Sequence, residues 1–256
     1  MTPELERAVA NAKEVFARYS LNGRITVCNC PVCVAPETER ELVCTPLSQM
    51  SSGLLAEYTH SAHGWDDKVA DDFRYLLPRY LELIAAGDIP SHHDIEGVLG
   101  RMYPANYRKA WPKKEAAAID GFFVALFRAE LNKPDVAGDF GLYEAGEGVE
   151  AILCAFAGIC GDVRLLLDVW DNTAGRDADV KIAGMLLAAD WFKRRLKNSS
   201  WFLHNREPVK QAMATVIAWL LTVDNWQRLE TACLTETDET IAELLSQAEG
   251  IIARHA

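Results

Sequence analysis

The chain has 256 residues, half of them hydrophobic and a quarter charged, which is typical of a folded globular protein rather than a disordered one. Its formal net charge of −11 repels nucleic-acid phosphates and anionic membranes, so both are disfavoured as partners, whereas a basic protein surface is an easier electrostatic match. No apolar run reaches the roughly 18 residues that a membrane-spanning helix needs, so we expect no membrane partner.

The first residues, MTPELERAVANAKEVF, carry acidic side chains where a secretory signal carries basic and then apolar ones. We therefore expect a cytoplasmic protein. In a reducing compartment the cysteines suit metal binding or thiol chemistry better than a disulfide framework, and their odd number, seven, agrees with this expectation.

The N-terminal part of the chain predicts one helix followed by a loop. Thr2 is a suitable N-cap and Pro3 a suitable first helical residue, so we predict a helix over 2–20. Residues 22–23, Asn-Gly, predict a turn. The cysteine-rich segment 27–44 shows little periodicity and contains prolines, so we expect a loop or knuckle there.

Helical periodicity dominates the rest of the chain. Helices are expected to resume after Thr45-Pro46 and again after Ser51. In the stretch 71–87 an apolar stripe predicts an amphipathic helix, which Pro78 should kink. The stripe consists of Phe73, Leu76, Leu77, Tyr80 and Ile84. Ser91 and Asp94 resemble a capping box, and further helices are predicted at 113–131, 147–160, 162–171, 177–197, 207–222, 224–233 and 237–254.

This pattern predicts an all-α fold of stacked antiparallel helix pairs, either HEAT-like or an irregular helical array, with a small cysteine-rich knuckle near the N-terminus. We expect a single helical domain over 1–256. It is divisible into halves 1–131 and 149–256, joined by the glycine- and acid-rich loop 132–148. A similarity between the segments that begin at Phe73 and Val163, with Trp111 and Trp201 at the same offset, suggests a helical repeat.

Four cysteines fall within seventeen positions in the pattern CxCx2Cx10C. A structural zinc ion needs four such soft donors, supplied by short loops. If the fourth cysteine is not a ligand, either of two histidines on the following helix can replace it. A redox pair, Cys30 and Cys33, is an alternative, although no thioredoxin-like strand–helix context surrounds it; an accidental cluster is another. The candidate zinc ligands are Cys28, Cys30, Cys33, Cys44, His60 and His63.

A second group of polar residues lies between positions 60 and 94. Histidines and carboxylates from neighbouring helices form the sites of metal-dependent hydrolases. No motif such as HExxH assigns roles to them, and carboxylates at 66–72 equally suit the first turns of a helix. The group contains His60, His63, Asp66, Asp67, His92, His93 and Asp94.

The order CNCPVC, TPL and GWDDKVADDFRYLLPRYLELI resembles an uncharacterised group of bacterial all-α proteins, in which a CxCPxC motif precedes a DDFRxxLPR helix. The resemblance covers about the first third of the chain, and Cys44 is not among the residues that carry it. It implies a bacterial cytoplasmic origin and no particular activity. The residues that carry it are Cys30, Cys33, Asp72, Phe73, Pro78 and Arg79.

These observations lead to three functional hypotheses. The absence of a complete catalytic motif favours a non-enzymatic protein-interaction module with a structural zinc site. A related hypothesis is an immunity protein or antitoxin, whose acidic surface covers a basic toxin. The third hypothesis is a metal-dependent hydrolase that uses the histidine and aspartate group at 60–94.

Overall fold

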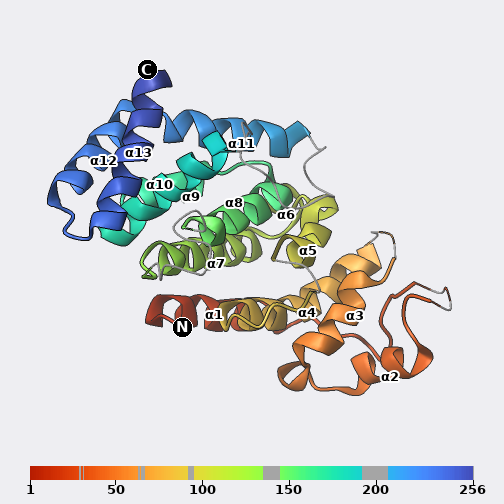
Figure 1. The fold of residues 1–256 in the computed structure, drawn as a ribbon. Helices are drawn as coiled ribbons and strands as arrows, with labels where there is room; N and C mark the ends of the chain where they lie inside the picture. The colour runs from red at the N-terminus through yellow and green to blue at the C-terminus, as the bar shows by residue number, and fades with distance from the viewer. Residues whose placement is uncertain are drawn as a thin grey trace. The chain divides into compact units, whose positions relative to one another are not determined.

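A computed structural model shows a chain built from helices (Figure 1). In the described residues it contains α-helices and two short 3-10 helices and no strand, which confirms the predicted all-α class. Regular stacking of helix pairs stays a prediction, and Trp201, one of the residues that suggested a repeat, lies outside the described residues. The structure describes residues 1–28, 30, 32–62, 64, 67–91, 95–134, 145–191 and 207–255.

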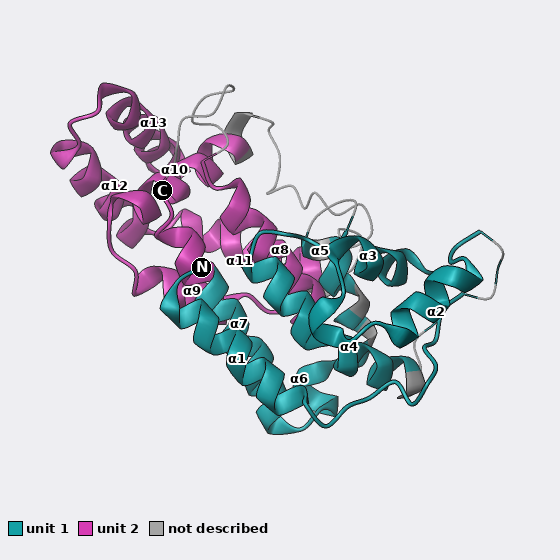
Figure 2. Ribbon diagram, turned by 90° about the horizontal axis from the view of Figure 1, so that it is seen from below, with its two compact units in different colours: residues 1–126 teal, residues 127–256 magenta. Residues whose placement is uncertain are grey.

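The chain divides into two compact units, Met1–Leu126 and Phe127–Ala256, which Figure 2 shows in teal and magenta. The division falls within a helix, α7, and the expected linker 132–148 includes residues 135–144, which are not described. The helices of the first unit are α1 (Pro3–Phe16), α2 (Pro36–Cys44), η1 (Leu47–Gln49), α3 (Ser52–His60), α4 (Asp67–Ala85), α5 (Ile95–Leu99), η2 (Gly100–Ala105), α6 (Tyr107–Ala110) and most of α7 (Lys113–Leu131).

Side-chain caps start α1 and α3 where the sequence predicts them. The Thr2 side chain accepts a hydrogen bond from the Leu5 N–H, and Ser51 accepts one from the Leu54 N–H. The α4 helix continues through Pro78 to Ala85 without restarting. Its predicted apolar stripe is buried at every position, and α4 packs along α1 (Figure 1).

The expectation of a loop throughout 27–44 is wrong for its second half, because α2 begins at Pro36 and ends at Cys44. Pro36 suits the first helical position, and Glu37 and Glu39 interact favourably with the free amides of the first turn. Only Leu42 is buried, so the helix has no apolar stripe that periodicity could reveal. Packing of α2 against α3 therefore stabilises a helix that its own apolar pattern does not predict.

A buried carboxylate, Glu115 of α7, joins three parts of the first unit. It is fully buried, forms an ion pair with Arg18 and accepts a hydrogen bond of 2.9 Å from the Tyr19 hydroxyl. Its other oxygen lies 3.6 Å from Nε of Arg74, on α4. The Arg74 guanidinium also lies over the Trp111 ring, 4.5 Å from its centroid. This cluster fixes α4 and α7 to the residues that follow α1.

The second unit is held together by close helix packing. Gly184 of α10 (Arg176–Trp191) lies so close to Ala145 that an added Cβ would be 1.4 Å from the Ala145 oxygen, so only glycine fits there. Arg228 of α12 (Val223–Thr235) donates to the carbonyl of Trp170, in the last turn of α9 (Arg164–Asp171), and to that of Thr173, two residues after the helix ends. The helices of this unit are α8 (Glu147–Cys160), α9 (Arg164–Asp171), α10 (Arg176–Trp191), α11 (Glu207–Leu220), α12 (Val223–Thr235) and α13 (Glu239–His255).

Candidate metal centre

Two buried side chains hold the cysteine-containing loop between α1 and α2. Asp72, in the second turn of α4, accepts a hydrogen bond of 2.8 Å from the Thr26 N–H. Ser61, directly after α3, accepts one of 2.7 Å from the Cys28 N–H. The residues Asp72 and Ser61 are 5% and 0% exposed, so water competes little for these bonds. The loop is therefore anchored to α3 and α4 before any metal binds.

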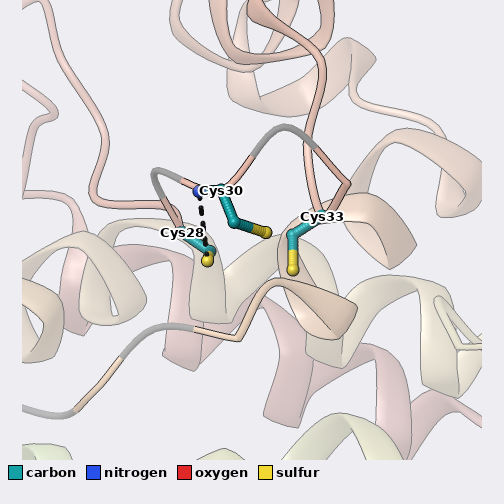
Figure 3. A group of neighbouring side chains, drawn as sticks. All are labelled: Cys28, Cys30 and Cys33. Carbon is teal, nitrogen blue, oxygen red and sulfur yellow. Dashed lines mark hydrogen bonds between the residues drawn. The ribbon is translucent and has the colours of Figure 1, made fainter.

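Three cysteine sulfurs gather on one side of this loop (Figure 3). The Sγ atoms of Cys28, Cys30 and Cys33 all lie within 4.8 Å of one another. In a tetrahedral zinc site with Zn–S bonds of about 2.3 Å, the sulfurs are about 3.8 Å apart. A small inward movement of these side chains is enough to reach that spacing, so the three thiols fit a zinc ion.

Backbone N–H groups also favour the thiolate forms of these cysteines. The Cys30 N–H donates to Cys28 Sγ at 3.5 Å. The Val32 N–H favours the thiolate of Cys30, and the Ala62 N–H, from the segment after α3, favours that of Cys33. Metals bind the thiolate form of cysteine, and N–H donors stabilise its negative charge. The loop and the segment after α3 therefore supply N–H groups that stabilise thiolates at this site.

Interactions within the trio of Cys28, Cys30 and Cys33 give two of its thiols different pKa values. Donation from the Cys33 side chain and from the Val32 N–H lowers the pKa of Cys30 to about 7. The Ala62 N–H acts to lower the pKa of Cys33, but the interactions of that thiol with Cys30 and Cys28 outweigh it, so its pKa is raised. Near neutral pH, Cys30 is the thiol of this pair that ionises first.

The structure brings together three of the six predicted zinc ligands. Cys44, the last residue of α2, is exposed and does not belong to the group of sulfurs. His60, the last residue of α3, is also exposed and outside the group. His63 lies outside the described residues. Among the described side chains, the three-cysteine group is the cluster with metal-binding spacing.

The histidine and aspartate group at 60–94 falls mostly on residues that are not described. His63, Asp66 and residues 92–94 are among them, so the proposed hydrolase site and the capping box of Ser91 and Asp94 stay predictions. Of the neighbouring carboxylates, Asp71 pairs with Arg74, and Asp72 holds the cysteine loop.

Sequence reasoning missed the residues that support the cysteines. Asp72 belongs to the DDFRxxLPR segment, yet the sequence suggests only a favourable position in the first turns of a helix. Ser61 carries no sequence signal, because its hydrogen bond joins residues 33 positions apart. Ala62 contributes only its backbone N–H, which every residue except proline has.

Comparison of the chain with protein-family models, curated proteins and solved structures gave no match. In the part of the chain that the structure describes, no helix is both long and apolar enough to cross a membrane.

Proposed function

We propose that Cys28, Cys30 and Cys33 bind a zinc ion whose role is structural. The observation that carries the proposal is the approach of their three Sγ atoms to within 4.8 Å. Three thiolates that close to one another repel, and a divalent cation between them removes that repulsion. The bound metal then fixes the conformation of the loop that Asp72 and Ser61 hold, so metal binding adds to the stability of the first unit.

A fourth donor completes the tetrahedral site, and the candidates remain Cys44, His60 and His63. We favour His63 because it lies two residues after Ser61, whose Oγ accepts the hydrogen bond from the Cys28 N–H. His63→Ala should then lower zinc affinity, whereas Cys44→Ser and His60→Ala leave it unchanged. Titration of each purified variant with zinc against a competing chelator separates the three candidates.

Elemental analysis of protein purified anaerobically without chelator tests the zinc proposal. We expect about one equivalent of zinc in the wild type and almost none in Cys30→Ser and Cys33→Ser. Cys154→Ser is the matched control, because Cys154 is buried beside Met213 in the second unit, and it should retain its zinc. Less than about half an equivalent in the wild type would contradict a resident zinc ion.

We further propose that the protein is a non-enzymatic module that binds a basic partner protein. Support comes from the net charge of −11 and from exposed carboxylates on two helices of the second unit. Complementary charge speeds association and gives specificity, and the resulting binding weakens as salt rises. The exposed carboxylates on α12 and α13 are Asp224, Glu230, Glu239 and Glu243.

The interaction is tested by isolating the partner of the tagged full-length chain, purifying it and measuring binding at two salt concentrations. Reversal of two exposed charges of α13, Glu239→Lys with Glu243→Lys, should weaken binding at low salt. Glu37→Lys with Glu41→Lys on α2 has the same spacing and exposure and is the control. Binding that depends on neither α13 charge nor salt would contradict the proposal; a basic toxin as the partner would make the chain its immunity protein.

A further inference from the structure

The tip of the cysteine loop faces solvent. Val32, between Cys30 and Cys33, has 88% of its surface exposed. A hydrophobic side chain that exposed has no packing role, and the three thiols beside it are themselves partly exposed. Small polar molecules therefore have access to the sulfurs without opening the core.

The same spacing that suits a metal also suits a disulfide. A disulfide bond brings two sulfurs to about 2.05 Å, and the trio needs a movement of less than about 3 Å to reach it. Two residues separate Cys30 from Cys33, whereas a single residue separates Cys28 from Cys30. The shorter ring is the more strained, so of these two pairs Cys30 and Cys33 are the better placed to bond. The chain's other four cysteines, all in described ranges, lie outside this group.

We propose that the trio is a redox-controlled metal site, in which a hydroperoxide oxidises Cys30 and Cys33 to a disulfide and so releases the metal. This inference rests on the proposed zinc site. Removing two thiolates leaves too few sulfur ligands for a tetrahedral zinc ion. The loop that Ser61 holds through the Cys28 N–H then loses its metal, so oxidation of the three cysteines changes the segment that contacts the residues directly after α3.

The reaction balances with the hydroperoxide as the two-electron oxidant. The Cys30 thiolate attacks the O–O bond, which breaks to give a sulfenic acid and an alcohol, or water when the oxidant is hydrogen peroxide. The Cys33 thiolate then attacks the sulfenic sulfur, an S–S bond forms, and hydroxide leaves and is protonated to water. Two thiolates, one hydroperoxide and two protons give one disulfide, one alcohol and one water. A dithiol reductant reverses the change and restores the site.

The test adds hydrogen peroxide to the zinc-loaded full-length protein. A chromogenic chelator measures released zinc, and mass spectrometry of alkylated peptides locates the disulfide. We expect complete loss of the bound zinc, one Cys30–Cys33 disulfide for each zinc released, and rebinding after reduction. Cys154→Ser, which leaves the three cysteines and every candidate fourth ligand intact, should respond as the wild type does.

The outcomes separate this inference from the zinc proposal. If the wild type binds zinc and keeps it while its exposed Cys44 becomes oxidised, the redox switch is wrong. That result would not contradict the zinc site. Zinc release with sulfinic acid at Cys30, with no disulfide, would also overturn it, because that product is not restored by a dithiol. A wild type that binds no zinc at all contradicts the site itself, as the elemental analysis would already have shown.

Discussion

At the scale of single residues, Ser61 is the side chain that most directly positions the proposed metal site. Its Oγ accepts the hydrogen bond from the Cys28 N–H, so Ser61→Ala leaves that N–H without this partner. Loss of a supporting hydrogen bond around a metal site typically weakens metal binding about 10–100-fold. We expect a weakening of that order, measured by competition with a chelator, with unchanged stoichiometry at saturating zinc. Ser48→Ala, at an exposed serine of η1, is the control, and equal affinities would exclude the positioning role.

Glu150 of α8 provides a prediction that is independent of the metal. Burial, reinforced by Glu147, raises its pKa from 4.5 to about 7, and its buried Oε1 has no hydrogen-bond partner. The folded protein therefore holds this proton more tightly than the unfolded chain does. Its contribution to stability is greatest below about pH 4.5 and is lost as the pH rises through 7.

Replacing Glu150 with glutamine should remove that dependence on pH. At pH 8 we expect Glu150→Gln to be more stable than the wild type by about 3 kcal/mol, and the difference should shrink toward pH 5. Urea unfolding at several pH values measures it. Glu230→Gln, at an exposed site on α12, should leave the unfolding free energy almost unchanged at each pH. A difference between Glu150→Gln and the wild type that does not vary with pH would mean that ionisation of the buried carboxyl is not its cause.

At the scale of elements, Glu115 links α4 and α7 through a buried ion pair. Glu115→Ala removes the buried carboxylate beside Arg74, whose side chain is 16% exposed and which, among the described residues, then keeps only its ion pair with the exposed Asp71. Breaking a buried pair by removing one partner typically costs about 3–5 kcal/mol. Glu37→Ala removes a carboxylate that is 75% exposed from its ion pair with Arg40 on α2, and this loss should stay below about 1 kcal/mol. Chemical denaturation of both variants measures the contrast. Equal losses would show that burial does not control the strength of these pairs.

Sequence periodicity predicts the longer helices well and α2 not at all. The helices α7 and α8 occupy the predicted residues because an apolar face repeats along them and glycine or proline lies beyond their ends. The α2 helix buries one leucine, so its presence depends on tertiary packing. A local sequence pattern carries no information about such packing. The same reasoning applies to the site: CxCxxC predicts the sulfurs, whereas Ser61 and Asp72 reach them through long-range contacts.

At the scale of the whole molecule, the proposed metal site and the exposed carboxylates of α12 and α13 belong to different compact units. The cysteine loop and its anchors on α3 and α4 all lie in the unit Met1–Leu126. The proposed partner surface lies in the unit Phe127–Ala256. Metal binding and partner binding therefore depend on separate sets of contacts, and we expect each to be removable by mutation without loss of the other.

Removal of the metal should accordingly loosen one unit and spare the other. Zinc fixes the conformation of the loop that Ser61 holds beside α3, so its removal by a chelator should increase amide hydrogen exchange in peptides covering residues 24–62. Helices α10 and α13 pack against each other within the second unit and should keep their protection. Hydrogen exchange followed by mass spectrometry, with and without chelator, gives both readings from one sample. Chelator added to Cys33→Ser, which should hold no zinc, controls for direct effects of the chelator. Increased exchange in both units of the wild type would mean that the metal stabilises the whole chain, and the separation of the two functions would then have to be abandoned.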